Sequence, residues 1–419
     1  MRIGIQTWGS DGDIRPFLAL AGGLRAAGHE ISVSVTSVDD KDYSALAAAL
    51  DVELIKVVDR LDIDYGAFVD KVAHLGTRLR LPYLFFSTTL FPWQYEMLEV
   101  AKAQCARCDV AIGHFLMYPM RAAAARRGVP FLTVTLCHGM VPTAYRPVMG
   151  LPDLGRRLNF LEWKLVQGFF NMGLKAAVNE MWRREGLGSV SHVLPDIMFS
   201  DTLNLVAVSP VFCSEPPDWR AHRVSGFLNV PERAEPFAVP AALEEFLSSG
   251  EPPVYMSFGS SGQLIAERSA EIMFEAARLA GVRAIVQTSS PEYPPDTVRD
   301  GVYSIGPTPH HAVFPRCAAI VHHGGAGTTH SATRAGRPSV VVPFMVEQAF
   351  WGHELKRTGV AGEPLSINGI TPAKLARRIR SVLANPEYGR CAQEAGRAMA
   401  GEDGVAKAVE MIEAVAESV

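Results

Sequence analysis

Apolar residues in this chain gather in short runs that alternate with longer stretches of mixed polarity. Near the start, apolar residues stand at alternate positions in residues 2–6 and 31–35, and residues 15–27 repeat at helical spacing. The two short stretches predict strands, and the longer stretch predicts a helix that stops at Gly28. The pattern therefore predicts a strand, helix and strand unit, with a tight turn at residues 9–13.

The same order returns in the second half of the chain. Residues 253–258 predict a strand, 259–262 a turn, 267–280 a helix that stops at Gly281, and 282–288 the next strand. Two such starts predict an α/β protein with two Rossmann-like domains, each a parallel sheet covered by helices. Open sheets of this type bind ligands at the carboxyl ends of their strands, so we expect the two parallel sheets to face each other across a cleft.

Length and proline content predict the boundaries of these domains. A chain of 419 residues suits two domains of ordinary size, and five prolines gather between residues 213 and 240. We therefore expect an N-terminal Rossmann-like domain at residues 1–215 and an interdomain linker at 216–238. A C-terminal Rossmann-like domain then follows at 239–391. Residues 392–419 have helical composition and no strand character.

Composition narrows the class of protein. Hydrophobic residues make up 48% of the chain and charged residues 20%, which is typical of a globular protein. A formal net charge of −4 gives no electrostatic reason to expect nucleic acid as a partner. No signal peptide or membrane-spanning run is visible, so the expected compartment is the cytoplasm. Nothing in the sequence predicts an oligomeric state.

Metal binding is the weaker of two interpretations for the clustered acids and thiols. Among six cysteines, only Cys105 and Cys108 share a CxxC spacing, and we interpret them as reduced structural thiols. Two pairs of aspartates with one intervening residue could bind a divalent ion: Asp11 with Asp13, and Asp62 with Asp64. Such pairs are common by chance, so we expect no metal.

A glycine-rich passage carries the clearest functional signal. Residues 322–329 follow the apolar run 318–321, which predicts a buried strand that turns into a helix. Such a turn exposes backbone N–H groups at the positive end of a helix dipole, which suits a phosphate or pyrophosphate. A second apolar run, 339–344, leads to Glu347 and Gln348 at the same edge of the sheet, where they could hold hydroxyl groups. A phosphate cradle beside hydroxyl-binding groups indicates a nucleotide sugar.

This passage resembles the donor-binding signature of family-1 glycosyltransferases of the GT-B fold. The resemblance rests on residues 323–328 together with Glu347 and Gln348, and the 24 residues that separate His323 from Glu347 match the signature. It implies a UDP- or dTDP-sugar as co-substrate and no other cofactor. It also implies that the C-terminal helix at residues 392–419 packs back on the N-terminal domain.

The donor-binding residues expected on this basis include a turn serine and a nucleoside-binding stretch. The tryptophan that stacks on uracil in plant enzymes is missing from residues 306–311, so we expect the backbone of Thr308 and the side chain of His310 to hold the nucleoside. Ser260 is an expected phosphate contact, with an ordinary turn serine as the alternative. The complete set is Ser260, Thr308, His310, His323, Gly325, Ala326, Gly327, Thr328, Glu347 and Gln348.

Asp13 is the candidate catalytic residue. It stands just before a predicted helix, where aspartate alone would act as a cap of the first free N–H groups. Residues 12–16 are similar to the corresponding passage of sterol, rhamnolipid and glycopeptide-antibiotic glycosyltransferases, which carry aspartate where many family-1 enzymes carry histidine. The resemblance implies inverting transfer with Asp13 as base. A normal carboxylate is a weak base, so Asp13 needs a raised pKa or acts by orienting the acceptor hydroxyl.

Aromatic residues in the first half predict an apolar acceptor site. The candidates are Phe85, Phe86, Trp93, Phe115, Tyr118 and Phe169. Leu158, Leu161, Leu165, Phe169, Met172 and Ala176 recur at helical spacing, with Arg156, Arg157, Lys164 and Lys175 nearby. A stripe of this kind belongs more often to the core of its own domain. The alternative is a helical lid over a lipophilic acceptor, with peripheral contact to a membrane surface.

The sequence as a whole predicts a glycosyltransferase. The expected reaction is metal-independent transfer of a sugar from a UDP- or dTDP-sugar to a hydroxyl of a lipophilic small molecule, namely a natural product, sterol or lipid. Two alternatives from other classes stay open. A sugar-nucleotide epimerase shares this architecture, and a noncatalytic homologue could activate a partner transferase, although such a protein need not keep the phosphate- and sugar-binding residues.

Overall fold

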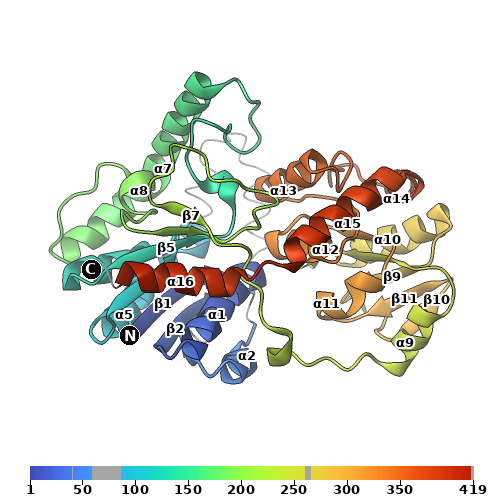
Figure 1. The fold of residues 1–419 in the computed structure, drawn as a ribbon, viewed down its shortest axis with the longest axis horizontal. Helices are drawn as coiled ribbons and strands as arrows, with labels where there is room; N and C mark the ends of the chain where they lie inside the picture. The colour runs from blue at the N-terminus through green and yellow to red at the C-terminus, as the bar shows by residue number, and fades with distance from the viewer. Residues whose placement is uncertain (40, 59–85, 260–265, 417–419) are drawn as a thin grey trace. The chain divides into compact units, whose positions relative to one another are not determined.

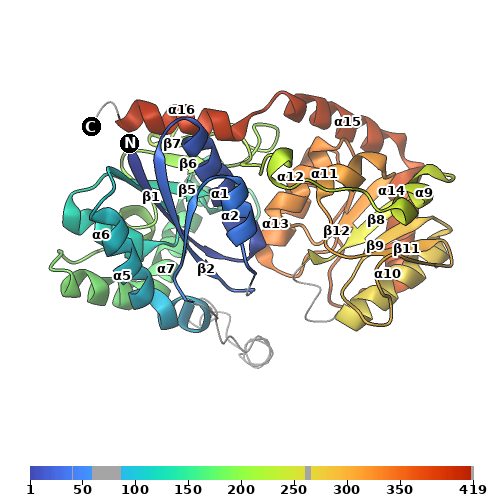
Figure 2. The same ribbon diagram turned by 90° about the horizontal axis from the view of Figure 1, so that it is seen from below.

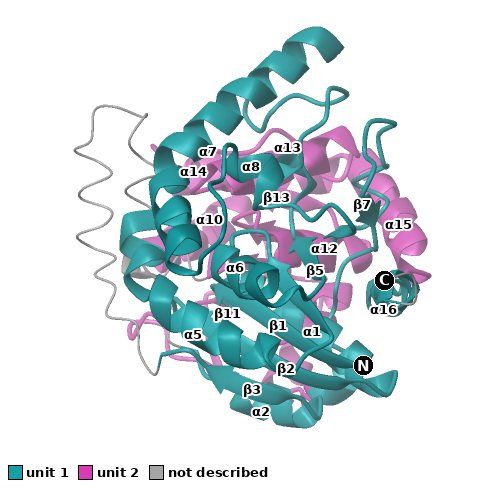
Figure 3. Cartoon of the chain, turned by 90° about the vertical axis from the view of Figure 1, so that its left-hand side faces the viewer, with its two compact units in different colours: residues 1–234, 403–419 teal, residues 235–402 magenta. Residues whose placement is uncertain are grey.

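The chain folds as two α/β units in a computed structural model that describes residues 1–39, 41–58, 86–259 and 266–416. Unit 1 consists of Met1–Ala234 with Asp403–Val419, and unit 2 of Glu235–Glu402 (Figure 3). Each unit holds a central sheet with helices around it (Figures 1 and 2). The predicted fold class, two Rossmann-like domains with parallel sheets, is confirmed.

Unit 1 contains a seven-stranded parallel sheet in the order β3-β2-β1-β4-β5-β6-β7. Its strands are β1 (Arg2–Gly9), β2 (Glu30–Ser37), β3 (Glu53–Lys56), β4 (Val110–His114), β5 (Phe131–Thr135), β6 (Asn204–Val206) and β7 (His222–Val224). Its helices are α1 (Asp11–Ala26), α2 (Ser44–Ala49), α5 (Gln94–Cys105), α6 (Tyr118–Arg127), α7 (Arg156–Arg184), α8 (Val193–Asp196) and α16 (Gly404–Ala416). Short 3-10 turns lie at Phe91–Trp93, His138–Met140 and Glu232–Ala234.

Unit 2 contains a six-stranded sheet in the order β10-β11-β9-β8-β12-β13, in which the β10 and β11 pair is antiparallel. Its strands are β8 (Val254–Ser257), β9 (Ala284–Gln287), β10 (Thr297–Arg299), β11 (Val302–Ile305), β12 (Ala319–His322) and β13 (Ser339–Val341). Its helices are α9 (Ala241–Ser248), α10 (Ala266–Ala280), α11 (His310–Val313), α12 (Ala326–Arg334), α13 (Val346–Arg357), α14 (Pro372–Ala384) and α15 (Pro386–Ala400), with a 3-10 turn at Phe314–Arg316.

Both sheets reverse their strand order at one internal position. In unit 1 the chain passes from β1 to β2 and β3 on one side, then continues with β4 to β7 on the other side. In unit 2 the equivalent strands are β8, which leads to β9, and β12, which leads to β13. Ligands of open α/β sheets bind outside the carboxyl ends of strands at such switch points. The loops after β1, β4, β8 and β12 are therefore the places to search for a site.

The strands are held by side chains that are buried on both faces of each sheet. Ile3 and Ile5 of β1 pack with Phe17 and Leu24 of α1, and all four lie at or below 1% exposure. Burial on both faces is typical of a parallel sheet that is covered by helices. One predicted strand, residues 339–344, ends early at Val341. The proline at position 343 has no N–H group with which to continue the ladder.

The C-terminal helix α16 belongs to unit 1, where it lies beside α1 (Figures 1 and 2). His29 Nε2 is 2.9 Å from Glu413 Oε1, and Ala408 and Ile412 are part of the unit 1 core. The division differs from the expected boundaries in two places. The expected linker 216–238 contributes β7 to the first sheet. Residues 392–402 belong to unit 2, because α15 packs closely on α12 at Gly396.

Helix α7 places its apolar stripe on the surface, so the favoured assignment of that stripe to the core is wrong. Leu158, Leu161, Leu165 and Met172 are 46%, 54%, 76% and 59% exposed. The helix instead packs on unit 1 through Trp163, Phe170, Leu174, Val178 and Met181. Helical periodicity alone could not identify the packing face, because both faces of α7 are apolar.

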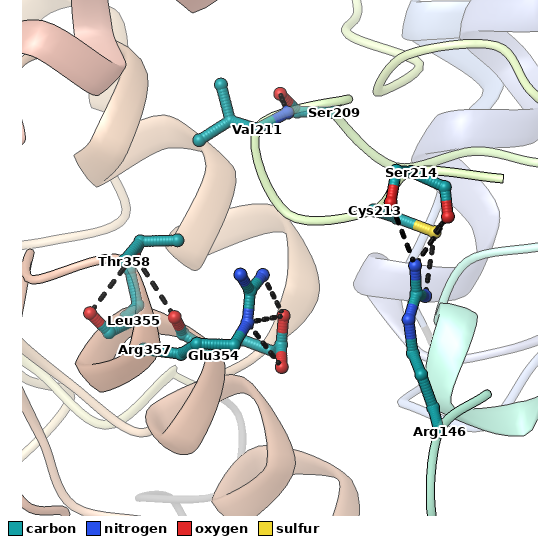
Figure 4. A network of polar contacts seen from close by, with 9 residues as sticks. All are labelled: Arg146, Ser209, Val211, Cys213, Ser214, Glu354, Leu355, Arg357 and Thr358. Carbon is teal, nitrogen blue, oxygen red and sulfur yellow. Dashed lines mark hydrogen bonds and ion pairs between the residues drawn. The ribbon is translucent and has the colours of Figure 1, made fainter. Parts of the chain in front are cut away.

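Figure 4 shows two polar clusters, one in each unit. In unit 1, the Arg146 guanidinium donates to the Ser214 carbonyl and to Cys213 Sγ, the latter at 3.1 Å. In unit 2, Arg357 donates to Glu354 Oε2 at 2.6 Å, and Thr358 Oγ1 donates to the Glu354 carbonyl at 3.1 Å. The first cluster holds two loops of unit 1 together, and the second finishes the last turn of α13.

The contact between α1 and α16 predicts that a methyl group at Gly23 destabilises unit 1. A Cβ atom there would lie 2.2 Å from Val405 Cγ1, so Gly23→Ala should lower the free energy of unfolding by about 1–3 kcal/mol, measured by denaturant titration. Gly168→Ala, where the added Cβ meets nothing within 4 Å, is the matched control and should not destabilise. Adding Val405→Ala to the Gly23 variant should restore part of the loss. A Gly23→Ala protein as stable as its parent would contradict this packing.

Candidate functional site

His323 lies at the switch point of unit 2 and is enclosed by two glycines. It directly follows β12, whose last residue, His322, pairs with Ser257 of β8. A Cβ atom at Gly259 would lie 2.6 Å from His323 Cε1, and one at Gly325 would lie 2.6 Å from its Nε2. Gly259 also has φ +57, a conformation that favours glycine. Both glycines are therefore needed for the imidazole to occupy this position.

The first turn of α12 presents backbone amides beside this histidine. Its N-cap residue is Gly325, which has no side chain to bond the free N–H groups, and the first turn carries no acidic residue. Gly327 and Thr328 are half-buried, so this end of the helix is accessible from solvent. The helix dipole favours an anion here, as the glycine-rich sequence predicts.

Gln348 and Glu347 lie at the start of α13, next to the same loop. Gly324 has φ +91, and a Cβ atom there would lie 2.5 Å from the backbone oxygen of Gln348. The side chain of Gln348 is buried, and its Oε1 accepts from Phe344 N at 2.8 Å, which caps α13. Glu347 is exposed in the first turn. The structure thus places the backbone of Gln348 against the glycine loop, with Glu347 one residue before it in the same helical turn.

Burial keeps the two adjacent histidines neutral. Desolvation lowers the pKa of His323 to about 4 and that of His322 to about 3. Gly324 N donates to His322 Nδ1 at 3.1 Å, so His322 shapes the loop from inside the core. His323 Nδ1 has no hydrogen-bond partner among the residues that the structure describes. A neutral imidazole can donate one hydrogen bond to a phosphate oxygen without itself being protonated.

The expected nucleoside-binding residues follow β11 at the same edge of the sheet. Thr308 Oγ1 donates to the Gly306 carbonyl at 2.9 Å, which fixes the turn. The His310 ring stacks on Phe314 with 4.2 Å between ring centroids. His330 of α12 is buried, with its Nδ1 2.7 Å from the Ala326 carbonyl oxygen. Ser260 lies outside the described residues.

Asp13 lies at the switch point of unit 1, in the first turn of α1. Its Oδ2 accepts from Ser10 N at 2.9 Å and from Ser10 Oγ at 3.2 Å, so it forms a capping box with Ser10. The pKa of Asp13 is raised to about 6, because desolvation, helped by the nearby carboxylates of Asp39 and Asp11, outweighs the lowering effect of the Ser10 hydrogen bonds. The residue both caps the helix and has a carboxylate of increased basicity.

A polar network that the sequence did not single out surrounds Asp13. Asp11 N donates to Asp39 Oδ2 at 3.3 Å, and Tyr43 OH donates to Asp11 Oδ1 at 3.4 Å. Lys41 Nζ lies 3.3 Å from Asp11 Oδ1. These residues come from the ends of α1 and β2 and from the loop before α2, so only the fold brings them together. The spacing of Asp11 and Asp13 was the one visible signal.

The neighbouring strand of the switch point, β4, ends at His114, and Phe115 follows it. Burial lowers the pKa of His114 to about 3, and its ring meets Phe17 of α1 edge-on, with 5.9 Å between centroids. Phe115 is half-buried and packs against His114, with 4.5 Å between centroids. The end of β4, which pairs with β1, therefore carries two uncharged rings, those of His114 and Phe115.

The other predicted acceptor aromatics lie in different environments. Tyr118 is buried and its hydroxyl donates to Gln94 Oε1 at 2.6 Å, so it serves the core of unit 1. Phe86 is buried, while Trp93 and Phe169 are half-buried, the latter on α7. Phe85 lies outside the described residues. Phe115 is the candidate that follows a strand of the switch point.

Within the described ranges, no group of three or more His, Cys, Asp or Glu is arranged to hold a metal ion. Asp62 and Asp64 fall outside those ranges. Cys105 and Cys108 are free and buried. No helix in the described part of the chain has the length and apolar character needed to span a bilayer.

Comparison with solved structures identifies the fold. The glycosyltransferase VinC in complex with DTDP superposes with a TM-score of 0.70 at 18% identity, covering all of both chains. The calicheamicin glycosyltransferase CalG4 gives a TM-score of 0.71 at 17% identity, over 100% of this chain and 99% of that chain. These similarities show that the chain has the fold of these glycosyltransferases, the GT-B fold.

Sequence comparison specifies the branch. Residues 270–415 match the family described as "Erythromycin biosynthesis protein CIII-like, C-terminal domain". The chain is 28% identical to O-mycaminosyltylonolide 6-deoxyallosyltransferase of Streptomyces fradiae, over 100% of this chain and 98% of that protein. It is 27% identical to the glycosyltransferase GtfE of Amycolatopsis orientalis, over 98% and 97%. The chain is therefore similar in sequence to glycosyltransferases of the antibiotic and sterol type.

The sterol enzymes in this group are longer proteins. Sterol 3-beta-glucosyltransferase of Kluyveromyces lactis is 27% identical over 97% of this chain, which spans only 34% of that protein. The chain thus corresponds to about a third of the sterol enzyme and to nearly the full length of the two bacterial transferases.

The close packing of the His323 ring against Gly325 predicts that a single methyl group at Gly325 weakens nucleotide binding. Gly325 has φ −62, so alanine fits the backbone, but its Cβ would displace the imidazole. Gly325→Ala should reduce the affinity for a nucleoside diphosphate by roughly 10-fold or more, measured by calorimetry, because a hydrogen bond to a charged group is lost.

Two comparisons isolate the cause of that loss. His323→Ala should weaken binding to a similar extent, and adding Gly325→Ala to it should have little further effect. Gly389→Ala in α15, where the added Cβ meets nothing within 4 Å, is the control for a methyl group elsewhere in unit 2. Unchanged affinity for the nucleoside diphosphate in the Gly325 and His323 variants would show that the diphosphate does not bind at this loop.

Proposed function

We propose that this glycosyltransferase moves a sugar from a nucleoside diphosphate sugar to a hydroxyl of a lipophilic small molecule, with inversion at the anomeric carbon. The observation that carries the proposal is the pairing of a neutral histidine with the free N terminus of α12 at the unit 2 switch point. Both groups favour a diphosphate, and neither needs a metal ion. We further propose that Glu347 and Gln348 hold the sugar hydroxyls.

A dTDP-sugar is the donor to test first. VinC and SsfS6 of Streptomyces sp. SF2575, both of similar fold, are described in complex with dTDP and thymidine diphosphate respectively. UDP is the alternative nucleotide. The relatives named for a macrolide and for sterols support an apolar, hydroxylated acceptor. Phe115, half-buried after β4, is the side chain we assign to its binding.

In the proposed reaction, the Asp13 carboxylate accepts the proton of the acceptor hydroxyl. The hydroxyl oxygen forms a bond to the anomeric carbon from the face opposite the diphosphate. The bond from that carbon to the phosphate oxygen breaks, and its electron pair leaves with the nucleoside diphosphate. The amides of residues 325–328 and the imidazole of His323 stabilise the charge that grows on the leaving group. A pKa of about 6 makes Asp13 a much stronger base than an ordinary aspartate.

Product analysis tests the proposed function against its alternatives. The protein is incubated with dTDP- and UDP-sugars, with and without hydroxylated macrolide and sterol acceptors, and products are identified by mass spectrometry and NMR. We expect a glycoside whose anomeric configuration is opposite to that of the donor, formed equally well in EDTA. Acceptor-independent conversion of the donor sugar would identify an epimerase. Absence of nucleotide binding would favour an auxiliary role, and a retained configuration would contradict the direct displacement.

The raised pKa of Asp13 predicts the pH dependence of the reaction. The ionised carboxylate is the active form, so kcat/KM should rise with pH, with a midpoint at about 6. Asp13→Asn should lower turnover at least about 100-fold and leave donor affinity near the parent value. Ser10→Ala removes a hydrogen bond that lowers the Asp13 pKa, and should therefore move the midpoint to higher pH.

Stability measurements separate this role from simple capping. Because folding raises the Asp13 pKa, ionisation of Asp13 weakens the native state as pH rises through about 6. Asparagine keeps a side-chain oxygen that can accept from Ser10 N and carries no charge, so Asp13→Asn should unfold no more easily than the parent at pH 8. A variant that turns over normally would reduce Asp13 to a cap.

A further inference from the structure

The outer face of α7 forms the densest exposed apolar surface in the described part of the chain. Seven of the thirteen large hydrophobic side chains that are exposed there fall within residues 151–172. Leu158, Leu161, Leu165 and Met172 follow each other at intervals of three, four and seven residues, which places them in one row along the helix. Contiguous apolar surface of this kind marks a place where a protein binds something.

The inner face of α7 is already used, so the outer row is additional. Trp163, Phe170, Leu174 and Val178 are buried and attach the helix to unit 1. The N-terminal half of the helix extends beyond the sheet of unit 1 (Figures 1 and 3). Leu151 and Leu154, in the loop that leads into α7, are 47% and 55% exposed and continue the same apolar surface. We call the surface made by Leu151, Leu154, Leu158, Leu161, Leu165 and Met172 the outer α7 face.

A row of cations borders the outer α7 face. Arg157, Lys164 and Lys175 are separated by seven and eleven residues, close to two and three helical turns, so they share one side of the helix. None of the three forms an ion pair with any residue in the described ranges. Lys164 lies over the exposed ring of Phe160, 5.3 Å from its centroid.

The same surface carries one exposed carboxylate, Asp153, whose Oδ1 accepts from Gly155 N and from Asn159 Nδ2, each at 3.0 Å. Between residues 154 and 179 the sequence contains one carboxylate, Glu162, and this side chain is buried, where its Oε2 accepts from Val148 N at 3.2 Å. The exposed charge of this segment is therefore entirely positive, although the whole chain carries a formal net charge of −4. A second copy of the chain would bring the same cations to the contact, and its residues 154–179 would bring no exposed acid to pair with them.

We propose that the outer α7 face binds the surface of an anionic lipid bilayer. The leucine row inserts among the acyl chains at the headgroup boundary, and Arg157, Lys164 and Lys175 contact acidic headgroups at its border. Apolar side chains beside a cationic row are the arrangement of helices that lie in the plane of a membrane interface. This binding does not depend on the proposed reaction. It would transfer the exposed leucines from water to the apolar acyl chains.

Vesicle flotation with the whole protein tests the proposal. We expect binding to vesicles of phosphatidylcholine with about 30% phosphatidylglycerol, weaker binding to pure phosphatidylcholine, and release at high salt as the charges are screened. Leu158→Ser/Leu161→Ser/Leu165→Ser should abolish binding. Arg157→Gln/Lys164→Gln/Lys175→Gln should weaken binding to the anionic vesicles roughly 100-fold.

Matched controls make a negative result informative. Leu279→Ser/Val298→Ser/Leu383→Ser changes three exposed apolar residues of unit 2 and should leave vesicle binding intact. Nucleoside diphosphate affinity, a property of unit 2, reports the integrity of that unit in every variant, and thermal unfolding reports that of unit 1. Failure to bind anionic vesicles, or equal binding by the leucine variant, would overturn the proposal. If the parent protein instead forms a dimer and does not bind vesicles, and the leucine variant is a monomer, the outer α7 face would be assigned to contact with a second copy.

Discussion

The parallel pairing of each unit's first strand on both of its sides is the constraint on which both candidate sites depend. β1 lies between β2 and β4, and β8 lies between β9 and β12, while the chain connections leave in opposite directions. No crossover therefore covers the carboxyl ends of these strands at the switch point. The loops there carry Asp13 in unit 1 and His323 in unit 2. Because the strands are buried on both faces, the positions of these loops are fixed by the cores rather than by the loops themselves.

Desolvation shifts the pKa values of these two residues in opposite directions. It disfavours charge in both cases, so the pKa of Asp13 rises to about 6 while that of His323 falls to about 4. At neutral pH the aspartate is ionised and unusually basic, and the histidine is a neutral hydrogen-bond donor. A base for the acceptor hydroxyl and a donor to the leaving phosphate follow from one physical effect. The close glycines at 259 and 325 are what allow the imidazole to be buried.

Sequence reasoning identified the elements that repeat and the glycine loop, because apolar runs and glycines report directly on buried strands and close backbone approach. It predicted that Gln348 reaches that loop, and the structure places its backbone oxygen against Gly324. It could not assign the packing face of α7, since Trp163 and Leu161 are equally apolar and only the fold decides which is covered. Nor could it find the polar network of Asp39, Lys41 and Tyr43, which is assembled from separate elements. Its expectation of a strand to residue 344 ignored the proline at 343.

A direct titration of the Asp13 carboxyl tests the central claim. The chain is labelled with aspartate that carries ¹³C at the side-chain carboxyl, and the Asp13 resonance is assigned by its loss in Asp13→Asn. The account predicts a midpoint at about 6 that coincides with the midpoint of the pH dependence of kcat/KM. A midpoint near about 4, the ordinary value for aspartate, together with a transfer rate that does not follow this titration, would contradict it.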